Sequence, residues 1–68
     1  MYSNVIEFTT EGINAAIARE IRVMGGALRL VASAESKGNK SGAAYARTRV
    51  ALSEDRIKSL RALADDLS

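Results

Sequence analysis

The chain has 68 residues, ten of them Lys or Arg and eight Asp or Glu, which gives a formal net charge of +2. It contains no His, Cys, Trp or Pro. The length allows one domain, spanning 1–68. The missing residue types exclude histidine acid–base catalysis, cysteine nucleophiles, disulfides and metal sites with nitrogen or sulfur ligands.

The remaining side chains offer little catalytic chemistry. Tyr2, Tyr45 and the hydroxyl residues have no base at an activating spacing. Asp65 and Asp66 are adjacent, so on a helix their carboxylates diverge by about 100° and do not clamp one metal ion. We therefore expect no enzymatic activity, no catalytic or metal-binding residues, no cofactor and no small-molecule substrate.

The small size of the chain points to self-association. Below about 70 to 80 residues, one hydrophobic core seldom supplies more than about 3–5 kcal/mol, and small scaffolds add disulfides, metal ions or a second subunit. The first two are closed to this chain, so we expect a homo-oligomer. No run approaches the roughly 20 apolar residues of a membrane span, and no signal peptide begins the sequence, so we expect a cytoplasmic protein without membrane contact.

The first expected elements are a strand and a helix. Residues 3–8 carry the β-branched and aromatic side chains of a short strand. A helix then starts near residue 10, where Thr9 and Thr10 offer a hydroxyl cap and Glu11 places a carboxylate in the first turn. Its apolar stripe ends before a glycine pair at 25–26, which predicts the end of the helix. The stripe is Ile13, Ile17, Ile21 and Met24.

The middle of the chain alternates with a period of two. Apolar and polar residues alternate over 28–35 and again over 45–52, and the loop 38–42 is rich in turn residues. We expect these segments to pair as a β-hairpin, in a register that places the apolar residues of both strands on one face and the polar residues on the other. A second helix starts near residue 54, after Ser53, and runs to the chain end. The favoured fold is α+β: a βαββα domain with a three-stranded sheet, two helices on one sheet face, and a dimeric assembly.

An all-α alternative stays open. Ile17, Ile21, Met24, Leu28 and Val31 follow 4-3-4-3 spacing, and a second heptad stripe holds from residue 43 to 67. Two helices of about 25 residues would form a hairpin that dimerises into a four-helix bundle. Against it, two glycines inside a helix cost about 2 kcal/mol relative to alanine. The second stripe is Ala43, Ala46, Val50, Ser53, Ile57, Leu60, Ala64 and Leu67.

The candidate binding residues are basic side chains around one tyrosine. Seven basic residues stand between 37 and 61 against two acidic ones. In the βαββα fold the open sheet face displays arginines that pair with phosphate or carboxylate, beside an aromatic anchor, and the loop adds two lysines. The competing interpretation is a solvated face, or a dimer-buried one in which Glu35 neutralises Arg47. The predicted partner-binding residues are Arg29, Lys37, Lys40, Tyr45, Arg47 and Arg49.

These features predict a non-enzymatic binding module. In size the chain resembles the accessory proteins and inhibitors that phages and other mobile elements carry, an analogy of size class and not of motif. Such a module docks on a protein or protein–nucleic-acid partner and blocks it sterically. The alternative is a small dimeric nucleic-acid-binding regulator that uses the same basic face on phosphates. We favour a protein partner because one aromatic residue is few for single-strand binding.

Overall fold

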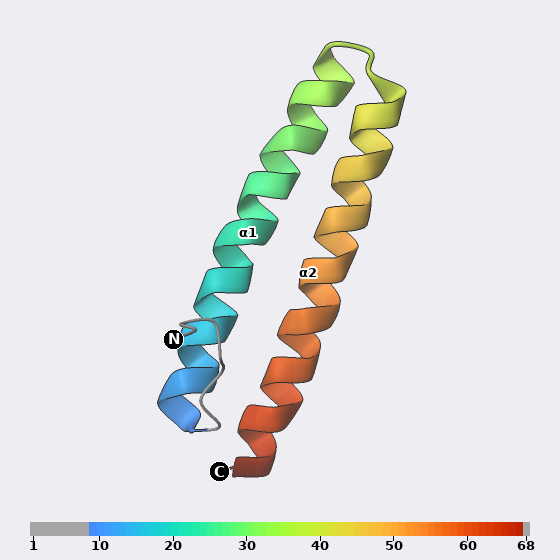
Figure 1. Cartoon of the computed structure of the whole chain (residues 1–68). Coiled ribbons are helices and arrows are strands. Elements are labelled where there is room, and N and C mark those ends of the chain that lie inside the picture. The colour runs from blue at the N-terminus through green and yellow to red at the C-terminus, as the bar shows by residue number, and fades with distance from the viewer. Residues whose placement is uncertain (1–8, 68) are drawn as a thin grey trace, which may run out of the picture.

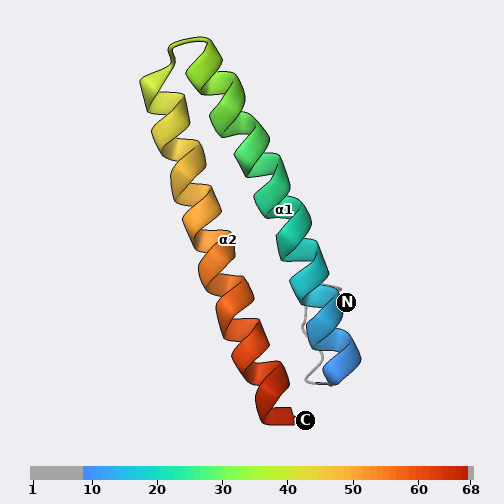
Figure 2. The ribbon, with the colours of Figure 1, turned by 180° about the vertical axis from the view of Figure 1, so that it is seen from behind.

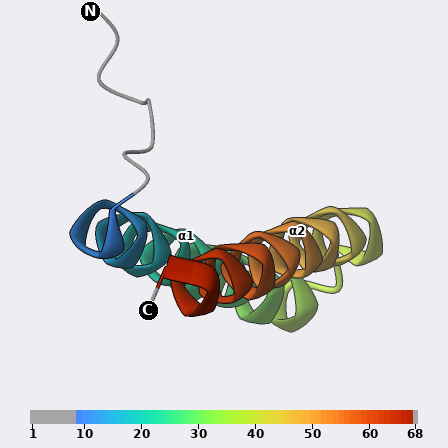
Figure 3. The ribbon, with the colours of Figure 1, turned by 90° about the horizontal axis from the view of Figure 1, so that it is seen from below.

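The computed structural model describes residues 9–67, which form an antiparallel pair of long helices (Figures 1 and 2). Helix α1 spans Thr10–Ser36 and helix α2 spans Lys40–Leu67. Residues 37–39 connect them. Seen from below, no third element of the described residues lies against the pair (Figure 3). The described chain is therefore a helical hairpin in which each helix packs against a single neighbour.

The βαββα prediction is wrong. Residues 28–35 lie inside α1, residues 45–52 lie inside α2, and no strand occurs among residues 9–67. The expected strand at 3–8 lies outside the described residues. The helical-hairpin alternative is confirmed, with helices of 27 and 28 residues. Its pairing into a four-helix bundle stays a prediction.

The start of α1 is set by the cap that the sequence indicated. Thr9 has extended backbone angles, and its Oγ1 accepts a hydrogen bond from the Gly12 N–H at 3.0 Å. Glu11 adds a carboxylate to the first turn, where the positive end of the helix dipole favours it. The predicted start near residue 10 is confirmed, because a side chain satisfies a backbone donor that the helix leaves unpaired.

The turn between the helices is built by Gly38 and Asn39. Gly38 has φ of 71°, its N–H donates to Glu35 O at 3.1 Å, and the Asn39 N–H donates to Ala34 O at 2.8 Å. This pair of bonds is a Schellman motif. Asn39 then begins α2, because its Oδ1 accepts from the Gly42 N–H at 2.9 Å. Two adjacent residues thus end one helix and cap the next, which reverses the chain within three residues.

Two predicted boundaries inside the helices are wrong. Gly25 and Gly26 lie in the middle of α1 and do not end it. Ser53 lies in the middle of α2 and is buried, so it does not cap a helix start. At both places the neighbouring turns continue the packing between the helices, and this tertiary packing outweighs the local preference.

The line of packing between the helices, which we call the seam, consists mostly of small side chains. Four of its six buried apolar residues are alanine, so the seam buries little apolar surface. Small side chains let two helices approach closely. The heptad stripe predicted for α2 coincides with the seam up to Ala64, whereas on α1 Ile21 and Leu28 are exposed. The buried seam residues are Ile13, Ala16, Ala27, Ala43, Ala46, Ser53 and Ile57.

Two ion pairs join the helices and show which residues of α1 and α2 lie beside each other. Arg47 Nη2 pairs with Glu35 Oε2 near the turn, and Arg56 Nη1 lies 3.7 Å from Glu20 Oε2 farther down. The first pair brings together the two residues that the sequence analysis paired, but it does so between two helices of one chain and not on a dimer-buried sheet face. Because both residues are largely exposed, the pair contributes at most about 1 kcal/mol.

We expect Gly38→Ala to destabilise the hairpin by about 1 kcal/mol, because a β-carbon disfavours the left-handed backbone at this position. Thermal unfolding followed by circular dichroism should show a melting temperature lower by roughly 4–8 °C. Gly38→Asn serves as the matched control with a smaller loss, since asparagine tolerates this region. Equal melting temperatures for Gly38→Ala and the native chain would contradict the turn.

Candidate functional site

One open side of the hairpin carries a shallow groove around Tyr45, which we call the tyrosine face. The groove has a volume of about 290 Å³ and lies between both helices. Val23 contributes from α1, and the other lining residues come from α2. The lining residues are Val23, Tyr45, Thr48, Arg49, Leu52, Ser53 and Arg56.

Helical spacing brings the α2 residues of the tyrosine face together. Tyr45, Arg49, Leu52 and Arg56 follow the spacing i, i+4, i+7, i+11, which places them on one side of α2. Tyr45 is 64% exposed and Leu52 is 52% exposed. On α1, Leu30 stands seven residues after Val23 and extends the apolar surface toward the turn. Large apolar side chains of both helices therefore face solvent beside two arginines.

The charge of the tyrosine face has one sign. No carboxylate is among the described residues that line its groove. Arg56 forms a long ion pair with Glu20, in which Nη1 lies 3.7 Å from Oε2. The other carboxylate oxygen of Glu20, Oε1, is buried and has no hydrogen-bond partner among the described residues. Within the described chain Arg49 belongs to no ion pair. Its guanidinium is thus available to a carboxylate or phosphate from outside.

The structure distributes the predicted binding residues over several surfaces. Tyr45 and Arg49 share the tyrosine face. Lys40 and Arg47 instead line a separate hollow of about 400 Å³ at the turn, beside Glu35.

The other two predicted residues lie elsewhere. Lys37 is the C-cap of α1. Arg29 stands two positions after the buried Ala27, so it lies on the side of α1 away from the seam. Because no sheet occurs among the described residues, the predicted binding residues do not share one sheet face. The binding role of each residue stays a prediction.

Sequence reasoning did not find five residues of the tyrosine face: Val23, Thr48, Ser53, Leu52 and Arg56. The signal that places the last two was present, since they follow Tyr45 at helical spacing. A period of two groups Tyr45 with Arg47 instead. Val23 has no such local signal, because only the pairing of the two helices brings it to the groove.

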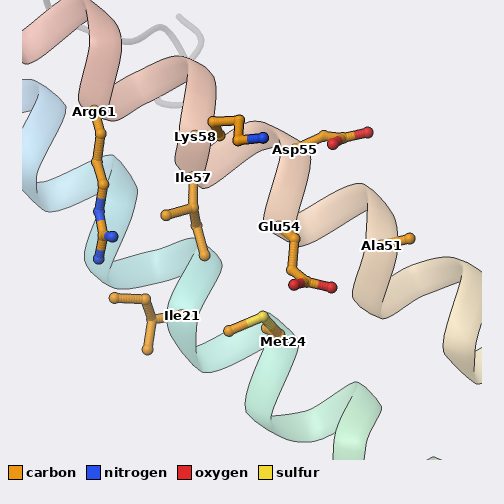
Figure 4. Close-up of a pocket in the computed structure, with 8 residues that line it drawn as sticks. All are labelled: Ile21, Met24, Ala51, Glu54, Asp55, Ile57, Lys58 and Arg61. Atoms are coloured by element: carbon orange, nitrogen blue, oxygen red, sulfur yellow. The ribbon is translucent and has the colours of Figure 1, made fainter.

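The opposite side of the hairpin carries a larger open groove of about 660 Å³, which we call the isoleucine face. Figure 4 shows Ile21 and Met24 of α1 lying near Ile57 of α2, with Glu54 and Arg61 extending toward α1 on either side of Ile57. The apolar floor is thus bordered by charged side chains of both signs, since Asp55 and Lys58 also line the groove.

The described residues offer no other chemistry of note. Within residues 9–67, no group of three or more acidic, histidine or cysteine side chains is placed to hold a metal ion. Neither α1 nor α2 is long and apolar enough to cross a membrane. No protein-family model, curated protein or solved structure matches this chain.

Proposed function

We propose that the chain is a non-enzymatic protein-binding module that docks through the tyrosine face and blocks the surface it covers. The observation that carries this proposal is Tyr45, a large aromatic side chain left 64% exposed in a groove beside Arg49 and Leu52. A cytoplasmic location fits a chain without cysteine but is part of the same proposal.

The combination of side chains suits a protein surface. Tyrosine and arginine are enriched among the residues that supply most of the binding energy at interfaces. Tyr45 brings a rigid ring and a hydroxyl, and Leu52 and Val23 add apolar surface beside it. An exposed apolar patch bordered by polar groups is typical of a docking site.

The charge of the face specifies the partner further. Arg49 and Arg56 stand in a groove whose lining includes no carboxylate within residues 9–67, so the complementary surface carries Asp or Glu around an apolar centre. Arg49 can form two parallel hydrogen bonds to one such carboxylate. We therefore propose an acidic, partly apolar protein surface as the partner, with occlusion of that surface as the mechanism.

We expect Tyr45→Ala to weaken partner binding by about 30-fold or more, the effect of losing a central anchor. The measurement is affinity capture by the tagged chain from a lysate of its own host, followed by titration of the captured protein. Arg22→Ala is the matched control, because Arg22 is exposed on α1 and lines none of the grooves described above. Circular dichroism should show equal helix content for both variants.

The nucleic-acid alternative gives a different result. Binding to DNA or RNA phosphates should fall steeply as salt rises, should respond to Arg49→Ala and should resist Tyr45→Ala. Capture that disappears after nuclease treatment, or that is unchanged by Tyr45→Ala, would overturn the protein-docking proposal.

A further inference from the structure

The isoleucine face is self-complementary, unlike the tyrosine face. The charged residues that line its groove are Glu54, Asp55, Lys58 and Arg61. Of these, Glu54 and Arg61 extend toward α1 (Figure 4), and neither of the two belongs to an ion pair within residues 9–67. The two residues are seven positions apart on α2, which is two turns or about 10 Å along the helix. One negative and one positive side chain therefore stand on the same face, separated by Ile57.

The apolar residues of α1 lie at the same level. The ion pair between Glu20 and Arg56 places these two residues beside each other across the seam. Ile17 and Ile21 stand on either side of Glu20 in α1, and Glu54 and Arg61 stand on either side of Ile57 in α2. The midpoints of the isoleucine pair and of the charged pair thus fall at one height along the hairpin.

We propose that a second copy of this chain docks on the isoleucine face, in a two-fold arrangement that forms an antiparallel four-helix bundle. A two-fold axis running across both helices at the level of Ile57 brings Ile17 of one copy against Ile21 of the other. The same axis brings Glu54 of each copy opposite Arg61 of the other. Both the apolar contact and the charge contact are then satisfied twice.

The second copy fits this face better than a different partner does. Ile21 is 45% exposed and Leu28, one heptad later, is 51% exposed, so the face leaves apolar surface uncovered. A seam made mostly of alanine supplies little stability to a chain of 68 residues that has no cysteine to form a disulfide. The charged side chains in the described part of the groove on the tyrosine face are all positive, so pairing this face with itself would place like charges against each other.

The charge contact gives a test that a non-specific association does not pass. In a Glu54→Arg homodimer, arginine faces arginine, and in an Arg61→Glu homodimer, glutamate faces glutamate. We expect each variant alone to dimerise at least about 30-fold more weakly, since the symmetry repeats each repulsive contact twice. An equimolar mixture of the two variants restores both attractive contacts, so we expect a heterodimer as tight as the native dimer.

Sedimentation equilibrium on the purified chain and its variants measures these affinities. Two further variants provide a matched pair, because Ile21 and Val23 are similarly exposed on opposite faces of α1, at 45% and 41%. Ile21→Gln should weaken the dimer, and Val23→Gln should leave it unchanged. If a single charge variant unfolds alone, recovery of its helical circular dichroism signal on mixing supports the same contact.

Three results would overturn the proposed dimer: a native chain that stays monomeric at millimolar concentration, a mixture no tighter than either variant, or a dimer lost with Val23→Gln and kept with Ile21→Gln. The dimer and the protein-docking function use different faces. Tyr45→Ala tests only the latter, so either proposal can fail without the other.

Discussion

Replacing Ile57 by alanine is expected to lower the free energy of unfolding by about 2–5 kcal/mol, the usual effect of deleting a buried isoleucine side chain. Ile57 is one of only two large apolar side chains buried in the described seam. A single core in a chain of this size supplies about 3–5 kcal/mol, so the variant should be largely unfolded. Alanine is the better helix former, so the loss reflects packing and not helix propensity.

Urea unfolding followed by circular dichroism measures this loss, at one fixed protein concentration, since dimerisation would make stability depend on concentration. Leu52→Ala is the matched control. It deletes an apolar side chain of similar size from the same helix, but Leu52 is exposed, so the change should stay within about 0.5 kcal/mol. Similar losses for the two variants would show that Ile57 is not part of the seam.

The heptad spacing of apolar residues predicted the helical hairpin, whereas the alternation of apolar and polar residues with a period of two predicted strands. In α2 the stripe from Ala43 to Ala64 predicted the seam residues correctly. Alanine and serine fit either face of a strand as well as a helix, so alternation over 28–35 and 45–52 carried little information. The chain contains twelve alanines, which favour a helix by intrinsic propensity. In the structure this preference prevails over the alternation of apolar and polar residues.

Local capping signals were reliable only where the helix had not already begun. Thr9 and Ser53 stand in similar surroundings, each directly after an apolar residue and with an acidic residue one or two positions later. Thr9 caps α1, whereas Ser53 is buried in the seam because the residues before it already continue α2 from Asn39. Whether a hydroxyl caps a helix therefore depends on what the preceding residues do, which local sequence does not specify.

The candidate site depended on the period assigned to the segment around Tyr45. A period of two places Tyr45, Arg47 and Arg49 together, while the helical period keeps Arg49 with Tyr45 and moves Arg47 to the opposite side, where it meets Glu35. The grouping of Arg49 with Tyr45 therefore did not depend on the period, whereas the grouping of Arg47 with Tyr45 did. Val23 enters the site through tertiary packing alone, so no local reading of the sequence indicates it.

The double substitution of Gly25 and Gly26 by alanine is expected to stabilise the hairpin by about 2 kcal/mol, since each glycine inside a helix costs about 1 kcal/mol relative to alanine. Both residues lie inside α1, and a β-carbon at either position meets no heavy atom within 4 Å. Within the described part of the single chain, no steric contact therefore offsets the gain. The melting temperature should rise by about 10 °C, or roughly 4–8 °C for each kcal/mol.

The same chemical change has a different expected effect elsewhere in the chain, which makes the test specific. At Gly42 a β-carbon would lie 2.6 Å from Asn39 Nδ2, so Gly42→Ala should disturb the cap of α2. This loss should offset the gain in helix propensity and leave the melting temperature nearly unchanged. Gly25→Ala and Gly26→Ala should raise it separately and nearly additively. A decrease with both of these variants would mean that α1 does not run unbroken through the glycine pair, because a chain that turned at 25–26 would need glycine for its left-handed backbone.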